Sequence, residues 1–165
     1  MTRKAPLALG ALAVTALLFG CSPEVDRVGE EEKEPLPEET PEAFTEFSDI
    51  QLPENPEELE ISVDRNRFDK PRYRIHMTGT VDDVDEVCGQ VGNYLRRSKE
   101  DWLESEAEEL DVPTDEIEDV DLENVYGCGA VIQSSGADID ALVLKPAEDD
   151  GGTATLYLHA APFQT

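Results

Sequence analysis

Alternation of apolar and polar positions marks one β-strand most clearly. Between residues 72 and 81, the apolar Tyr73, Ile75, Met77 and Val81 alternate with polar side chains. Successive side chains of a strand point to opposite faces, so this pattern predicts a strand with one buried and one wet face. Shorter patterns predict four further strands, over residues 58–63, 126–134, 139–145 and 153–161, of which the stretch 139–145 is apolar on both faces.

Apolar residues at helical spacing predict one long helix over residues 84–104. Asp83, followed three residues later by Glu86, resembles a capping box at its start. Residues 148–152 have the composition of a turn and predict a hairpin between the last two strands. Together these patterns predict an α+β fold, in which a small, mostly antiparallel sheet carries one long helix packed on it.

A different composition precedes residue 58. From Ser22 to about Asn55 the chain contains five prolines and a run of three glutamates, with little aliphatic material. Low hydrophobicity and like charge leave little to bury, which predicts a disordered acidic tether. A recognition segment around Phe44 and Phe47 is the alternative for this stretch. The predicted division is therefore a signal segment (1–20), a linker (21–57) and a single domain (58–165).

The first twenty residues are typical of an export signal. Arg3 and Lys4 precede an apolar run that ends at Gly20 and is short for a membrane span, which needs about 20 apolar residues. The run closes with Leu18-Phe19-Gly20-Cys21, which resembles the lipobox of bacterial lipoproteins. Phe19 is larger than the residue usual in that motif.

The lipobox resemblance implies removal of the signal peptide and a diacylglyceryl thioether, with fatty acids such as palmitate, on Cys21. It also implies a location on the extracytoplasmic side of the cell membrane, held there by lipid. An ordinary secretory signal with a chance cysteine, or an uncleaved signal anchor, is the alternative.

The cysteine count agrees with the lipidation of Cys21. The chain contains three cysteines, so lipidation leaves the even pair Cys88 and Cys128 in a compartment where disulfides persist. Cys88 lies on the apolar face of the predicted helix and Cys128 on that of a predicted strand, which predicts a helix-to-strand disulfide. Two free buried thiols are the alternative.

The charge balance restricts the partners. Lys and Arg number 13 against 39 Asp and Glu, and removing Arg3 and Lys4 makes the balance more negative. Binding to nucleic acid needs basic groups to neutralise phosphates, so no nucleic-acid partner is expected. The same excess disfavours adhesion of the polypeptide to anionic headgroups, which leaves attachment through the lipid on Cys21.

Two weak site candidates remain. Arg72, Arg74 and His76 share the polar face of one predicted strand, which suggests a site for an anionic polymer or an acidic envelope protein. Pairing of these cations with nearby carboxylates of the same chain is the alternative. An acidic stretch offers weak calcium candidates, although it lacks the central glycine of an EF-hand loop, so a solvated loop is the alternative. These candidates are Asp115, Asp119, Asp121 and Glu123.

Enzyme motifs are sparse. The two histidines, His76 and His159, do not stand in an H-E-x-x-H spacing, and neither a G-x-S-x-G motif nor a phosphate-binding glycine loop occurs. The sequence therefore predicts no catalytic residue and no cofactor. Two function classes stay open: a lipid-anchored binding or interaction module, and an envelope enzyme whose groups converge only in the folded chain. A cavity joining a histidine, a carboxylate and a nucleophile would favour the enzyme, and an open groove would favour binding.

Overall fold

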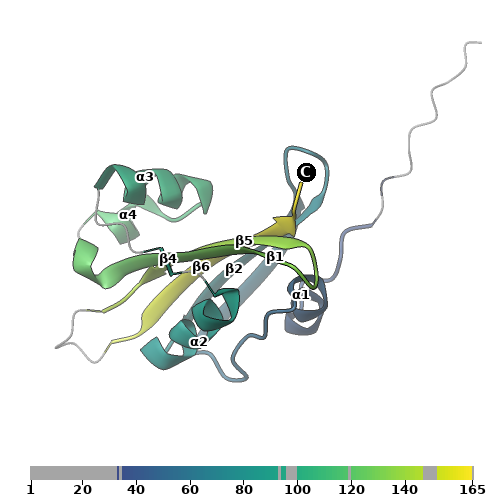
Figure 1. Cartoon of the computed structure of the whole chain (residues 1–165). Helices are drawn as coiled ribbons and strands as arrows, with labels where there is room; N and C mark the ends of the chain where they lie inside the picture. Colours follow the sequence, from purple (N-terminus) through teal and green to yellow (C-terminus); the bar gives the residue numbers. More distant parts are fainter. Residues whose placement is uncertain are drawn as a thin grey trace, which may run out of the picture. The chain divides into compact units, whose positions relative to one another are not determined.

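A six-stranded antiparallel sheet forms the centre of the described chain, with strand order β1-β2-β6-β5-β4-β3 (Figure 1). The computed structural model describes residues 33, 35–92, 94–95, 100–118, 120–146 and 152–164, and the folded unit begins at Pro35. The strands are β1 (Glu58–Arg65), β2 (Pro71–Gly79), β3 (Tyr94–Leu95), β4 (Val125–Ile132), β5 (Ala137–Leu144) and β6 (Ala154–Pro162). The α+β class and the antiparallel sheet are as predicted, and so is the pairing of β5 with β6.

Helices cover both faces of the sheet (Figure 1). They are α1 (Pro41–Ser48), α2 (Val81–Val91), α3 (Glu100–Glu109) and α4 (Thr114–Ile117), followed by a 3-10 turn, η1 (Leu122–Asn124). Helices α1 and α2 pack on one face, here called the α2 face, where the larger core cluster lies. Helices α3 and α4 pack on the other, here called the α3 face, over a smaller cluster built around Leu142, Leu144 and Tyr157.

The alternation predicted for β2 is confirmed by burial. Tyr73, Ile75 and Met77 point to the α2 face and are at most 2% exposed. In β6, Leu156 and Leu158 occupy the same face, while Tyr157 and His159 point to the α3 face and are also buried. The polar side of β6 is therefore largely buried, because α3 and α4 cover part of it.

The predicted long helix over residues 84–104 is wrong, because the chain forms two helices there. Helix α2 ends at Val91, where Gly92 takes a left-handed conformation (φ 91°) that glycine adopts at little cost. Tyr94 and Leu95 then pair with β4 as β3, and α3 follows on the opposite face of the sheet. Tertiary pairing of these two residues overrides their helical spacing.

The start of α2 differs from the prediction by one turn. Its capping box joins Thr80 and Asp83, not Asp83 and Glu86: the Thr80 hydroxyl accepts from the Asp83 backbone N–H, and the Asp83 carboxylate accepts from the Thr80 backbone N–H. Thr80 provides the short hydroxyl that an N-cap needs, so the helix begins at Val81.

The predicted linker extends too far, because its described part from Pro35 belongs to the folded unit. Thr40 caps α1, and the ring of Phe44 is fully buried, edge-on to Tyr73 at a centroid distance of 5.6 Å. Ile50 is buried as well. Apolar side chains such as Phe44 and Ile50 dock this segment on the sheet, although its average composition is acidic and rich in proline.

The predicted disulfide is present between Cys88 of α2 and Cys128 of β4, with Cα atoms 5.6 Å apart. Both cysteines are buried on the α2 face, so the bond fastens the helix to the sheet. Among the described residues, no helix is both long enough and apolar enough to span a membrane.

Candidate functional site

A row of polar side chains crosses the α3 face of the sheet. The strand register aligns Ser62 of β1, Arg74 of β2, His159 of β6 and Asp140 of β5. Aligned residues of neighbouring strands point to the same face, so the four side chains stand side by side. Gly129 of β4 ends the row, and a Cβ there would meet Asp140 Oδ1 at 2.8 Å. The glycine leaves room for this carboxylate.

The arginines of this face are paired with carboxylates. Arg72 binds Asp64 through two hydrogen bonds of 3.0 and 2.8 Å, which hold the pKa of that carboxyl below its usual range. Arg74 donates to Asp64 and also reaches Asp111 Oδ2 at 2.8 Å. Arg72, Arg74 and His76 do share one face, as predicted, but the two guanidinium groups have the internal partners that the alternative proposed.

His159 is held as a neutral base. Its side chain is buried, and Nε2 lies 3.7 Å from Asp111 Oδ2, which is too long for a hydrogen bond. Burial, assisted by the positive charges of Arg72 and Arg74, lowers the pKa of His159 to about 4. The imidazole therefore carries no charge at neutral pH.

Tyr157 lies next to His159 on the same side of the sheet. Its phenol ring stacks on the imidazole of His76, with centroids 4.8 Å apart. Burial raises the pKa of Tyr157, and so does the interaction of its hydroxyl with the Glu116 carboxylate, which is close but falls short of hydrogen-bond geometry. The hydroxyl thus stays protonated at any physiological pH.

Three buried polar atoms converge here without a hydrogen-bond partner in the described part of the chain: Arg74 Nε, Tyr157 Oη and His159 Nε2. Tyr157 and His159 are only 7% and 8% exposed. Most buried polar atoms in folded proteins have a partner, because an unpaired one loses its hydration without compensation. The arrangement therefore indicates a place for a bound molecule or for water.

A cavity of about 760 Å³ opens over these atoms and is here called the polar cleft. Its floor is the α3 face of β1, β2 and β6, and one wall is the connection from α3 to α4. The polar and charged residues around the polar cleft are Glu39, Glu60, Ser62, Arg74, His76, Asp111, Glu116, Tyr157 and His159. Four carboxylates face a single guanidinium, so the cleft is negatively charged.

A second cavity, of about 520 Å³, shares His159 with the polar cleft and also contacts Asp140. Burial raises the pKa of Asp140 to about 6, and the nearby carboxylates of Asp138, Glu106 and Glu109 add to this effect. Acidic groups therefore surround the histidine on both sides.

Among the described residues of the cleft, Ser62 and His159 do not stand side by side as a nucleophile and its base. Ser62 lines the cleft, but the strand that carries Arg74 lies between Ser62 and His159. Strands are about 4.8 Å apart, so the two residues are separated by roughly 10 Å. The geometry favours the binding of a ligand over acyl transfer by this pair.

The weak calcium candidates are spread over separate elements. Asp115 lies in the first turn of α4, Asp121 caps η1 by accepting from the Glu123 backbone N–H, and Asp119 lies outside the described residues. Within the described ranges, no group of three or more Asp, Glu, His or Cys side chains is arranged to hold a metal ion.

Sequence reasoning did not find the polar cleft. Asp111 follows α3 and meets Tyr157 and His159 of β6 only in the fold. One feature of the sequence could have indicated the cleft. In β6, Tyr157 and His159, whose rings carry polar atoms, alternate with Leu156 and Leu158. Comparisons of this chain with protein-family models, with curated proteins and with solved structures gave no match.

Proposed function

We propose that this protein is a lipid-anchored, extracytoplasmic binding module whose polar cleft holds a ligand with an ammonium group. The anchor rests on the apolar run that ends at Cys21 and on its likeness to a lipobox. The disulfide between Cys88 and Cys128 supports the same location, because disulfides persist outside the reducing cytosol.

The observation that carries the binding role is the pair of unpartnered atoms, His159 Nε2 and Tyr157 Oη, beneath the carboxylates of the polar cleft. A neutral imidazole has one nitrogen that accepts, and a phenol oxygen also accepts. An ammonium group has three donors and no acceptor, so it complements these two atoms together with Asp111 or Glu116.

Charge favours a cation over an anion in this site. Arg74 is already bound to Asp64 and Asp111, so an anion would have to displace one of these carboxylates. A cation gains from the carboxylates of Glu60 and Glu116 on the Tyr157 side of the cleft, whereas the positive charges of Arg72 and Arg74 oppose it beside His159. The unpartnered Arg74 Nε–H would then donate to an oxygen atom of the same ligand. The cavity of about 760 Å³ has the size of a small-molecule site.

Thermal unfolding in the presence of ethanolammonium chloride tests the ligand class, because this probe combines an ammonium with an oxygen. We expect a saturable rise in Tm relative to the same concentration of sodium chloride, since a ligand that binds only the folded state stabilises it. Tyr157→Phe and Glu116→Gln should weaken the response. Glu104→Gln, a matched change on α3 outside the polar cleft, should leave it unchanged.

Two results would count against an ammonium site. The first is a Tm response that is equal for ethanolammonium and sodium. The second is a larger response to sodium acetate, which would favour the anion site predicted from the arginines.

Metabolic labelling with a tagged fatty acid tests the anchor separately. Cys21→Ser should abolish the label, whereas Cys128→Ser should retain it, because Cys21 alone stands directly after the signal segment. Undiminished labelling of the Cys21→Ser variant would mean that the lipid assignment is wrong.

A further inference from the structure

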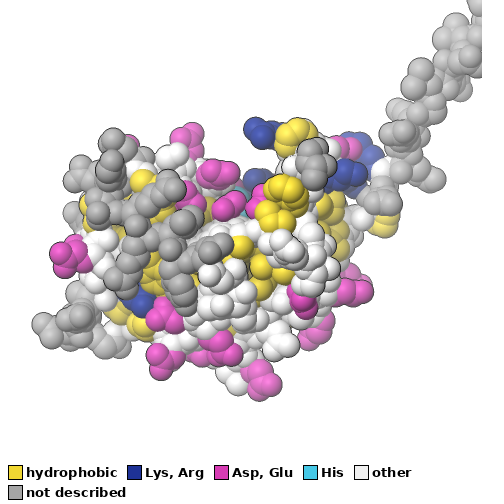
Figure 2. Space-filling model, viewed as in Figure 1, with side chains coloured by type: hydrophobic (Ala, Val, Ile, Leu, Met, Phe, Trp, Pro, Cys, Tyr) yellow, Lys and Arg dark blue, Asp and Glu magenta, His cyan; other side chains and the backbone are white. Residues whose placement is uncertain are grey.

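Positive charge is concentrated at one end of this acidic molecule. Arg65, Arg67, Lys70, Arg72 and Arg74 fall within ten residues of a chain whose net charge is −26. They belong to the hairpin of β1 and β2, and Figure 2 shows Lys and Arg side chains gathered there around hydrophobic ones. Arg67 and Lys70 are exposed at the tip.

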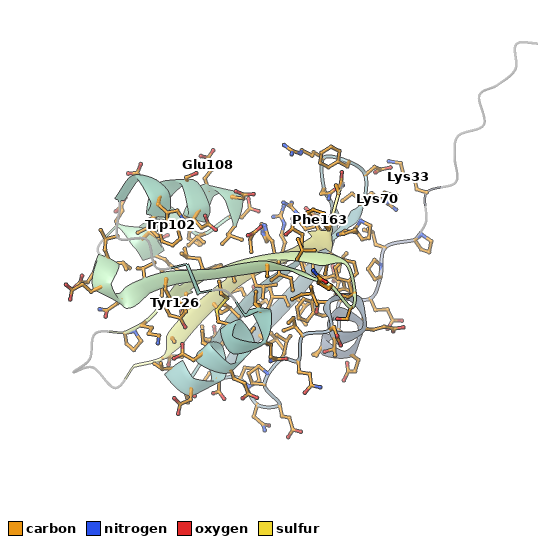
Figure 3. All side chains as sticks on the ribbon, viewed as in Figure 1. Lys33, Lys70, Trp102, Glu108, Tyr126 and Phe163 are labelled. Carbon is orange, nitrogen blue, oxygen red and sulfur yellow. A yellow bond between two sulfur atoms is a disulfide. The ribbon has the colours of Figure 1, made fainter. Side chains whose placement is uncertain are left out.

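The same end carries exposed apolar side chains. Phe68, at the hairpin tip, is 52% exposed, and Phe163, which follows β6, is 48% exposed. The register places the last residues of β6 beside the first residues of β2, so both rings lie at this end of the sheet. Val131, another exposed apolar residue, is near the end of β4 on the same side. We call Arg67, Phe68, Lys70 and Phe163 the hairpin end; Figure 3 labels Lys70 and Phe163.

Hydrogen bonds within the hairpin tip fix its conformation. The side-chain oxygen of Asn66 accepts from the backbone N–H groups of Phe68 and Lys70, and Arg65 donates to the Asp69 carbonyl at 2.8 Å. The guanidinium of Arg67 lies 4.7 Å from the centroid of the Phe68 ring. An aromatic ring with a cation beside it suits a boundary between apolar and polar surroundings.

The first residues of the folded unit lie near the hairpin end. Just after Pro35, the Glu38 carbonyl accepts from Tyr73 Oη, and the Glu39 carboxylate accepts from the Val63 backbone N–H. Val63 and Tyr73 face each other two residues before the hairpin turn. A chain anchored upstream of Pro35 therefore joins the domain close to the hairpin end.

We infer that the hairpin end lies against an anionic lipid bilayer, with Phe68 and Phe163 at the interface and Arg67 and Lys70 at the headgroups. This inference rests on the proposed lipid anchor. It differs from the expectation drawn from net charge, which treats the acidic excess as evenly spread. Because charges in water are screened over about 8 Å, carboxylates on the far side of the domain contribute little at this end.

Carboxylates close to this end reduce the attraction. Asp64 is bound by Arg72 and Arg74, and Asp69 lies next to Arg65. Three further carboxylates line the cavity of about 520 Å³ together with Arg67 and Phe68: Glu109, Asp138 and Asp140. A lipid anchor raises the effective concentration of the domain at the membrane, so a weak contact is enough to orient it. Each basic side chain near an anionic leaflet favours contact by about fivefold.

Quenching by brominated lipids tests the orientation in the full, acylated chain. Phe68→Trp, combined with Trp102→Phe, places the single tryptophan at the hairpin end. We expect its fluorescence to be quenched more strongly in brominated phosphatidylcholine vesicles that contain phosphatidylglycerol than in vesicles without it. Adding Arg67→Gln and Lys70→Gln should lower the contact constant by about 25-fold, and high salt should act in the same direction.

Two controls separate this contact from other causes. Wild-type Trp102, on α3, should be quenched little in either vesicle. Ser105→Glu with Asn124→Asp changes the net charge by the same amount at positions outside the hairpin end and should leave the quenching of the Phe68→Trp reporter unchanged. Equal quenching with and without phosphatidylglycerol, in protein whose mass confirms the acyl chains, would overturn the inference. Absence of the acyl chains would instead contradict the proposed anchor.

Discussion

The two faces of the sheet divide the tasks of the domain. On the α2 face, α1 and α2 cover an apolar surface in which Tyr73, Met77 and Leu158 are fully enclosed. On the α3 face, the apolar cluster covers only part of the sheet, and the rest carries Arg74, His159 and their carboxylate neighbours. A domain with one closed apolar face can tolerate unpartnered polar atoms on the other, and the proposed binding role is placed on that second face.

The largest loss of stability is expected when the side chain of Phe44 is removed from the α2 face. Phe44→Ala should lower the free energy of unfolding by about 3–5 kcal/mol, because it removes a fully buried ring. Phe68→Ala is the matched control and should change it by less than about 0.5 kcal/mol, since that ring is exposed. Urea unfolding measures both. Equal losses would mean that α1 does not belong to the core.

Removal of the disulfide on the α2 face should cause the next largest loss of stability. Cys128→Ala should destabilise the domain by about 3–4 kcal/mol, because the bond closes a loop with a sequence separation of 40 residues. Reduction of the wild-type protein should give a similar loss in urea unfolding. A loss below about 1 kcal/mol in both experiments would show that α2 is held to β4 by packing alone.

On the α3 face, substitution of Asp140 is expected to raise the free energy of unfolding, by less than the losses expected on the α2 face. Folding raises the pKa of Asp140 from 3.8 to about 6, so the folded state binds more protons between these values and loses stability as the pH rises through 6. Asp140→Asn removes this cost and should stabilise the domain by about 2 kcal/mol at neutral pH, allowing for partial exposure to solvent.

The pH dependence identifies the cause of that gain. Thermal unfolding should show no stabilisation by Asp140→Asn below about pH 3, where the carboxyl is protonated in both states. Glu108→Gln, on the exposed surface of α3, should give no comparable gain at either pH. A destabilised Asp140→Asn variant at neutral pH would mean that the charged carboxylate has a stabilising partner.

The two faces also differ in how well the sequence predicts them. The α2 face follows from local periodicity, because the alternation in β2 and β6 and the positions of Cys88 and Cys128 repeat at strand or helix spacing. The docking of α1 was missed because composition averages out the contribution of Phe44. The break after α2 was missed because it depends on Gly92 and on pairing with β4.

The α3 face was harder to predict, since its site is assembled from distant segments. Arg74 and His159 become neighbours only through the pairing of β2 with β6, and Asp111 reaches them from the end of α3. The concentration of basic residues was visible in the sequence, but their carboxylate partners were not. Charge patterns alone could not distinguish a free cationic surface from a paired one.

The most direct test of the binding role is the state of His159 Nε2. The chain contains only two histidines, so long-range nitrogen–proton correlation spectra resolve each imidazole, with His76 as the internal reference. We predict that Nε2 of His159 bears no proton at neutral pH and that its resonance shifts saturably as ethanolammonium is added, with a smaller shift at His76. A protonated Nε2, or a resonance that does not respond to ethanolammonium, would contradict the proposed ammonium site.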